Sequence, residues 1–112
     1  MQVFNVQPAI QDERHGVAKQ YRFFTEETNP NPKLDIGYII FPAGARVPET
    51  GFTFHPGHEF SYVVSGSLQV FSGGTLHTIN PGDCTFIPAR EEHYSYNITQ
   101  EDCVLKYILI ED

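Results

Sequence analysis

The chain is a succession of short apolar and aromatic segments separated by turn residues. Segments with the length and composition of strands occupy residues 2–6, 18–25, 34–41, 52–55, 59–65, 67–71, 75–79, 84–87, 92–97 and 103–110. Gly, Pro and Asn gather between them, and Ser72-Gly73-Gly74 suits a tight hairpin. Beyond a turn near residues 9–14, no helix is predicted. Short strands divided by turns about every 8–12 residues predict an antiparallel sandwich or barrel.

Strand parity predicts which side chains share a face, because successive side chains in a strand point to opposite sides. In 59–65 one face carries Glu59, Ser61, Val63 and Ser65, and the other carries Phe60, Tyr62 and Val64. Both faces of 103–110 are largely apolar. One face must line the interior of so small a domain, so the other needs cover from the N-terminal segment or a second subunit. We therefore expect a homodimer.

Length and charge narrow the classes of partner. A chain of 112 residues with 40% hydrophobic residues suits one domain with a real core. Its net charge of -7, without any cluster of Lys and Arg, argues against nucleic acid and anionic membranes as partners. The N-terminus lacks the features of a signal peptide, and no apolar run is long enough to span a membrane. We expect a cytoplasmic protein in which Cys84 and Cys103 are buried core residues, a disulfide being the less favoured alternative.

The stretch FTFHPGHEFSYVVSG, residues 52–66, carries the candidate chemistry. It places His55, His58 and Glu59 at the entrance of an otherwise apolar strand. His55 and Glu59 are four residues apart and would share a face in an unbroken strand, although Pro56-Gly57 can interrupt it. Burying these groups without partners is costly, and metal ligation removes that cost.

The spacing of these residues resembles the two sequence motifs of the cupin superfamily. The first motif matches from His55 through Glu59 to Gly66, and the second matches GDCTFIPAREEHYSYN, residues 82–97. The resemblance covers roughly residues 34–110 and implies an all-β double-stranded β-helix, or jelly-roll barrel, with the two motifs on facing strands. We expect one cupin domain over residues 1–112, with motif one at about 53–66 and motif two at about 82–97.

The chain departs from the family pattern at three positions. Thr53 stands where the family has its first histidine. The glycine expected six residues before it is missing, Gly44 being the nearest equivalent. Arg90 replaces the middle glycine of the second motif. Arg90 is either a tolerated turn residue, which we favour, or a group that reaches an anionic ligand.

The resemblance implies one divalent transition metal, either Fe, Mn, Ni or Zn, held by His55, Glu59 and His93. Two imidazoles and one carboxylate are a known facial ligand set that leaves positions open for substrate. The alternative is a hydrogen-bonded polar cluster in a metal-free barrel. Thr53, His58, Ser61 and Ser95 are candidates to line the pocket, with His58 favoured as a rim residue over a fourth ligand.

Two classes of function follow from the resemblance. The first is a metal-dependent enzyme of the dioxygenase, isomerase or lyase type acting on a small organic substrate, for which His58 or a pocket tyrosine would be the base. The second is a non-catalytic cupin that binds or senses a small molecule. The flanking Tyr94 and Tyr96 are expected to pack, and His15 and His77 to be solvated.

Overall fold

The computed structural model describes residues 1–3, 7–8, 17–24 and 26–112, and this part of the chain folds entirely into strands and loops. The strands are β1 (Gln7–Pro8), β2 (Lys19–Arg22), β3 (Leu34–Phe41), β4 (Arg46–Val47), β5 (His58–Ser65), β6 (Leu68–Ser72), β7 (Thr75–Ile79), β8 (Cys84–Ile87), β9 (His93–Tyr96) and β10 (Cys103–Ile110). Among the described residues, no helix has the length and apolarity needed to cross a membrane.

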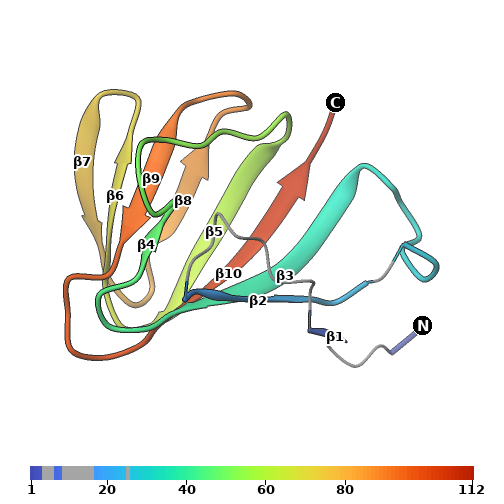
Figure 1. The fold of residues 1–112 in the computed structure, drawn as a ribbon. Helices are drawn as coiled ribbons and strands as arrows, with labels where there is room; N and C mark the ends of the chain where they lie inside the picture. The colour runs from blue at the N-terminus through green and yellow to red at the C-terminus, as the bar shows by residue number, and fades with distance from the viewer. Residues whose placement is uncertain (4–6, 9–16, 25) are drawn as a thin grey trace.

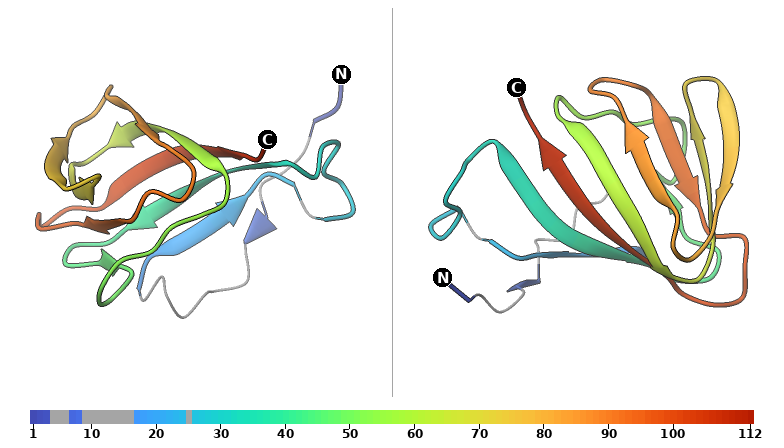
Figure 2. Two further views of the ribbon diagram at one scale, coloured as in Figure 1. Left: turned by 90° about the horizontal axis from the view of Figure 1, so that it is seen from above. Right: turned by 180° about the vertical axis from the view of Figure 1, so that it is seen from behind.

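The strands form two antiparallel sheets that face each other (Figures 1 and 2). The larger sheet has the order β1-β2-β3-β10-β5-β8, and the smaller has the order β4-β9-β6-β7. Consecutive strands β7 and β8 lie in different sheets, so the chain crosses between layers as it does in a jelly roll. The prediction of an all-β jelly-roll barrel is confirmed.

The core lies between the two sheets and draws on both. Val63 and Leu105 come from the larger sheet, and Leu68, Val70 and Ile79 come from the smaller one. These inward positions alternate along each strand with outward ones, as the period of two requires. Parity along 59–65 is as predicted, since Ser61 and Val63 are buried whereas Phe60, Tyr62 and Val64 are exposed.

Several strand predictions were wrong. The segment 52–55 is a loop with a single β-bridge at Thr53, because Pro56 lacks an amide hydrogen and interrupts the ladder. The short strand β4 was not predicted. In the predicted strand 2–6, residues 2–3 are not in a strand and residues 4–6 lie outside the described part, as does the predicted turn at 9–14.

The expectation of two buried cysteines was wrong for one of them. Cys103 is buried in the core, but Cys84 is exposed on β8, and both are free thiols. Cys84 pairs with Tyr62 in the strand register and therefore shares its outward face. Parity alone could not show this, because residues 84–87 carry apolar groups on both faces.

The backbone at Gly66 explains why the first motif ends in a glycine. It connects β5 to β6 with a φ of 72°, in the left-handed region that favours glycine. A Cβ at this position would lie 2.2 Å from the carbonyl oxygen of Asp102. The glycine therefore permits both the turn and the close approach of the chain before β10.

Candidate metal centre

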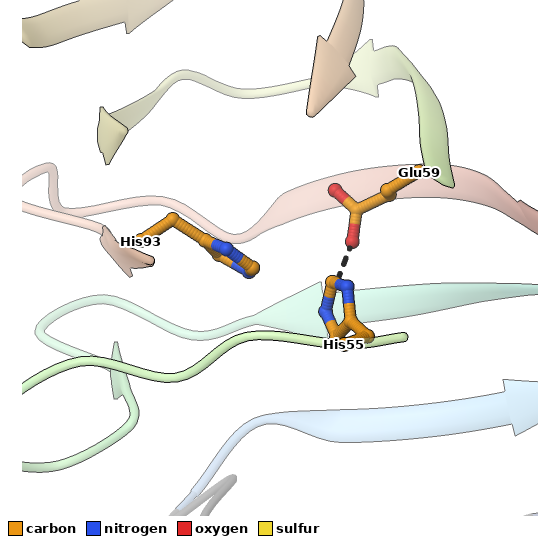
Figure 3. A group of neighbouring side chains, drawn as sticks. All are labelled: His55, Glu59 and His93. Atoms are coloured by element: carbon orange, nitrogen blue, oxygen red, sulfur yellow. Dashed lines mark ion pairs between the residues drawn. The ribbon is translucent and has the colours of Figure 1, made fainter. Parts of the chain in front are cut away.

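Three side chains from three separate segments converge between the sheets. His55 comes from the loop before β5, Glu59 from the start of β5, and His93 from the first residue of β9 (Figure 3). One potential ligand atom from each lies within 4.8 Å of the other two. His55 Nε2 is 3.5 Å from Glu59 Oε1, and the rings of His55 and His93 are 4.7 Å apart between centroids.

Backbone hydrogen bonds hold the two histidine segments together. Thr53 and His93 exchange both of their N–H···O=C bonds, at 3.0 and 2.9 Å. The backbone N–H of Arg90 donates to the carbonyl of His55 at 2.7 Å. The loop that carries His55 is thus tied to motif two at both ends, although it forms no regular strand.

The turn before His93 accounts for the middle glycine of the family's second motif. Glu91 N–H donates to the Pro88 carbonyl at 3.1 Å, and Arg90 at the third position has a φ of 66°. A type II turn requires a positive φ there, which glycine adopts without strain. Arg90 keeps the turn but bears the steric cost of a left-handed non-glycine residue.

His93 is oriented by a carbonyl, and this fixes which nitrogen can bind a metal. His93 is only 5% exposed, and its Nδ1 lies 2.9 Å from the carbonyl oxygen of Glu91. A carbonyl can only accept, so Nδ1 carries the hydrogen and Nε2 keeps its lone pair. The Glu91 side chain is itself anchored, since Ser72 Oγ donates to Glu91 Oε2 at 2.6 Å.

Glu59 is the carboxylate of the cluster, and burial raises its pKa above the usual value of 4.5. The neighbouring His93 and a hydrogen bond from Ser61 oppose that rise. Ser61 Oγ donates to Glu59 Oε2 at 3.2 Å, so the other oxygen, Oε1, remains directed toward His55. A cation between the three groups would offset the desolvation of this carboxylate.

The donor types suit a divalent transition metal. The three ligand atoms spread over up to 4.8 Å, however, whereas two ligands at about 2.1 Å from one ion lie at most about 4.2 Å apart, so a bound ion would draw these side chains closer together. Two ligand atoms about 2.1 Å from one ion in tetrahedral geometry lie about 3.4 Å apart, close to the observed His55–Glu59 separation. Neutral imidazole and carboxylate suit Fe, Mn, Ni and Zn alike. The same contact also describes an ion pair, so the geometry alone accommodates the metal-free alternative.

The family follows from the sequence match. Residues 37–110 match the Cupin domain family. This chain is a cupin. Two motifs, a jelly-roll fold and the matched range agree with the resemblance inferred from the spacing.

Solved structures similar to this cupin share its fold at low identity. A predicted oxalate decarboxylase from Thermotoga maritima aligns with TM-score 0.81 and 20% identity over 99% of this chain and 100% of that chain. The polyketide cyclase RemF from Streptomyces resistomycificus aligns with TM-score 0.78 and 17% identity, over 96% and 75% respectively. The cupin domain of Cnp3 from Schizosaccharomyces pombe aligns with TM-score 0.74 and 20% identity, over 96% and 69%. No curated protein matches the sequence.

Two cavities in this cupin meet at the cluster. The first, which we call the triad cavity, has a volume of about 240 Å³ and is lined by His55, Glu59 and His93 together with apolar groups such as Phe41 and Leu105. The second, the side cavity, measures about 370 Å³ and is lined by Glu59, Ser72, His77 and Glu91. Glu59, Ser95 and Leu105 line both cavities and separate them.

The predicted pocket residues divide between the interior and the outer face. Thr53 and Ser95 line the triad cavity, and Ser61 supports Glu59 from behind. His58 lines neither cavity. Its Nδ1 accepts a hydrogen bond from Ala89 N–H at 3.0 Å, and its ring lies 5.8 Å from that of Phe86 on the outer face. His58 therefore links motif one to motif two through this hydrogen bond. Because its ring lies outside both cavities, it is not positioned to act as a base on a ligand bound in them.

The tyrosine and histidine that were expected to pack or to be solvated lie away from the candidate metal centre. Tyr94 stacks on Phe71 at 5.5 Å on the outside of the smaller sheet, and Arg46 lies 4.1 Å above its ring. His77 is exposed, at the mouth of the side cavity. His15 lies outside the described residues.

Sequence reasoning missed Tyr107 as a wall of the triad cavity. Tyr107 is 4% exposed, and its hydroxyl accepts a 2.6 Å hydrogen bond from Gln20 Nε2. Burial raises the pKa of its phenol to about 12. The signal was present, because Tyr107 is the one polar side chain among Cys103, Leu105 and Leu109 on the inward face of β10.

Proposed function

We propose that this cupin is a metal-dependent enzyme, of the dioxygenase, isomerase or lyase type, that acts on a small organic substrate in the triad cavity. The observation that carries the proposal is the convergence of His55, Glu59 and His93 on one interior point beside a cavity. A bound divalent ion would supply Lewis-acid or oxygen-activating chemistry there.

The chain's own residues would position that chemistry. Glu91 holds the Nδ1 hydrogen of His93, and Ser61 holds one oxygen of Glu59, so both ligands are oriented before a metal arrives. Thr53, in place of a third histidine, leaves a position for water or substrate next to His93.

The cavity limits the size and character of the substrate. A volume of about 240 Å³ corresponds to about eight water molecules at about 30 Å³ each, which suits a small molecule. Phe41 and Leu105 supply apolar walls, whereas Thr53 and Ser95 supply hydroxyl groups. Such a cavity favours a compact substrate with one polar end toward the cluster. The names of two similar structures, a predicted oxalate decarboxylase and a polyketide cyclase, are consistent with an acid or carbonyl substrate.

The alternative is a non-catalytic cupin that binds or senses such a molecule. It is favoured by the absence of a free general base among the described residues that line the triad cavity, where the titratable groups besides Tyr107 are the three cluster residues. In this reading the metal, or the cluster alone, would fix the polar end of the ligand.

A substrate panel separates the two functions. Protein stripped of metal and reloaded with Fe, Mn, Ni or Zn would be incubated with oxalate and other small carboxylic and keto acids, with product measured by mass spectrometry. We expect metal-dependent consumption of one compound that a chelator stops and that Glu59→Gln abolishes, while the exposed Glu92→Gln leaves it intact. Stoichiometric binding without consumption would favour the binding module instead.

A further inference from the structure

The charge of the triad cavity is set by very few ionisable side chains. Among the described residues that line it, these are the three cluster residues and Tyr107, whose phenol is neutral, and none is Lys or Arg. A divalent ion held by two neutral imidazoles and the carboxylate of Glu59 would keep one uncompensated positive charge. That charge balances one anionic oxygen of a ligand and no more.

The other walls of the triad cavity supply no counter-charge for a second anionic group. Ile39, Phe41 and Leu105 line it beside the cluster, and Phe41 and Leu105 are only 2% and 6% exposed. The hydroxyl groups of Thr53 and Ser95 form hydrogen bonds but carry no charge. A second carboxylate placed against these walls would be buried without a cationic partner, which is costly.

The arginines on neighbouring segments do not supply that partner. Arg22 Nη2 is already 3.3 Å from Asp35 Oδ2. Arg46 Nη1 donates to the carbonyl oxygen of Pro48 at 2.7 Å. Arg90 is exposed and lines neither the triad cavity nor the side cavity. Two of these guanidinium groups are therefore engaged elsewhere, and the third lies outside both cavities.

The side cavity disfavours a second anion as well. Besides Glu59 it is lined by Asp83 and Glu91, and no Lys or Arg is among its lining residues in the described part of the chain. Its imidazole, that of His77, is exposed at the mouth. A ligand that extended past Glu59 into this cavity would bring its far end toward two further carboxylates, which repel negative charge.

We propose that the ligand of the triad cavity is a monoanion. One carboxylate or enolate oxygen would bind at the cluster, and an uncharged, apolar body would lie against Ile39, Phe41 and Leu105. The inference rests on the proposed function, because it takes the triad cavity as the substrate site. It narrows the substrate to short aliphatic or aromatic monocarboxylic and 2-oxo acids, and it excludes dicarboxylates such as oxalate.

Isothermal titration of the metal-loaded chain with butyrate and with succinate tests the proposal. Both acids have four carbons and differ at the far end, which is a methyl group in butyrate and a second carboxylate in succinate. Titration under nitrogen, with the divalent ion that the chain binds most tightly, keeps binding separate from turnover. We expect butyrate to bind at least about tenfold more tightly than succinate, because the second carboxylate would be buried without a partner.

Ile39→Arg is designed to reverse this preference. Ile39 is partly buried, lines the triad cavity and lies between Gln20 of β2 and Leu105 of β10 in the sheet. An arginine there supplies the missing counter-charge, so succinate should bind more tightly than butyrate. Leu76→Arg is the matched control, because it adds the same charge at a 50% exposed position of β7 that lines neither cavity, and it should keep the preference for butyrate.

Circular dichroism establishes that each variant is folded. If Ile39→Arg fails to fold, Val47→Arg carries the test, because Val47 lines the same cavity from the edge strand β4. A folded cavity variant that keeps the preference for butyrate overturns the proposal. Reversal by Leu76→Arg also overturns it, because overall charge and not the cavity would then set the preference.

The outcomes for the wild-type chain separate this inference from the proposed function. Succinate that binds as tightly as butyrate overturns the inference and leaves the catalytic proposal standing. Binding of neither acid overturns the inference as well. A chain that prefers butyrate but converts no compound in the substrate panel supports the inference and counts against catalysis. A chain that retains none of the four metals contradicts the proposed function and this inference with it.

Discussion

The side chain of Asn97 should be one of the most important single contributors to the stability of the barrel. Asn97 is fully buried and uses its whole hydrogen-bonding capacity. Its Nδ2 donates to the carbonyl oxygens of Phe41 and Glu101 at 2.8 and 2.7 Å. Its Oδ1 accepts from the N–H and the hydroxyl of Thr99 at 2.9 and 2.7 Å. It thereby joins the end of β3 to the loop that follows β9.

We expect Asn97→Ala to lower the free energy of unfolding by about 3–5 kcal/mol. The two hydrogen bonds donated by Nδ2 contribute about 1 kcal/mol each, and the buried carbonyl of Phe41 left without its donor adds about 1–3 kcal/mol, whereas the partly exposed Thr99 groups can bond to water instead. At about 4 °C per kcal/mol the melting temperature should fall by about 12–20 °C. Asn97→Asp should be at least as destabilising, because it keeps the volume but replaces the donating Nδ2 with a carboxylate oxygen that faces the two carbonyls of Phe41 and Glu101.

Urea denaturation and thermal melting of the Asn97 variants measure this loss of stability directly. The control is Asn80→Ala, because Asn80 is exposed and should cost less than about 1 kcal/mol. If Asn97→Ala were as mild as Asn80→Ala, or if Asn97→Asp were as stable as wild type, the hydrogen-bond argument would be refuted.

Three further predictions concern the turns and the buried carboxylate. Arg90→Gly should raise the free energy of unfolding by about 0.5–1 kcal/mol, because the strain of a left-handed arginine exceeds the entropy that glycine adds to the unfolded chain; an unchanged urea midpoint would argue against a strained turn. Gly66→Ala should cost more than about 3 kcal/mol or prevent folding, since its Cβ meets the Asp102 carbonyl, and normal expression and melting would contradict this. In metal-free protein the folded state holds the Glu59 proton more tightly than the unfolded state, so the contribution of Glu59 to stability should be greatest below about pH 4.5 and fall as pH rises through its raised folded-state pKa. Urea titrations of wild type and Glu59→Gln at several pH values measure the difference in their free energies of unfolding. This difference should change with pH as described, and a difference that does not change with pH would contradict the prediction.

The regular parts of the fold could be predicted from the sequence because their side-chain pattern is strong. The long strands 34–41 and 103–110 have the predicted bounds, and the outward face of 59–65 is as parity requires. Where both faces of a strand are apolar, as in 84–87, periodicity could not say which face is inside. The exposure of Cys84 depends on how β8 pairs with β5, a tertiary contact that the local sequence pattern does not reveal.

The candidate site was predictable as a set of residues but not as an arrangement. Motif spacing singled out His55, Glu59 and His93, which the fold brings within 4.8 Å of one another. The loop at residues 52–55 was taken for a strand, because its aromatic and β-branched residues outweighed the interruption by Pro56. The outward position of His58 follows from its placement on β5, one residue before the inward-facing Glu59. Strand parity already implied that the two point in opposite directions.

Metal binding by the purified chain tests the central claim most directly. Isothermal titration with each of Fe, Mn, Ni and Zn, checked by elemental analysis of the bound ion, should show one divalent ion per chain for wild type. His55→Ala and His93→Ala should lose it. His58→Ala should keep it while losing about 1 kcal/mol of stability with the Ala89 hydrogen bond. A stoichiometric ion that survives His93→Ala, loss of the ion on His58→Ala alone, or a folded wild-type chain that binds none of the four metals would contradict the account.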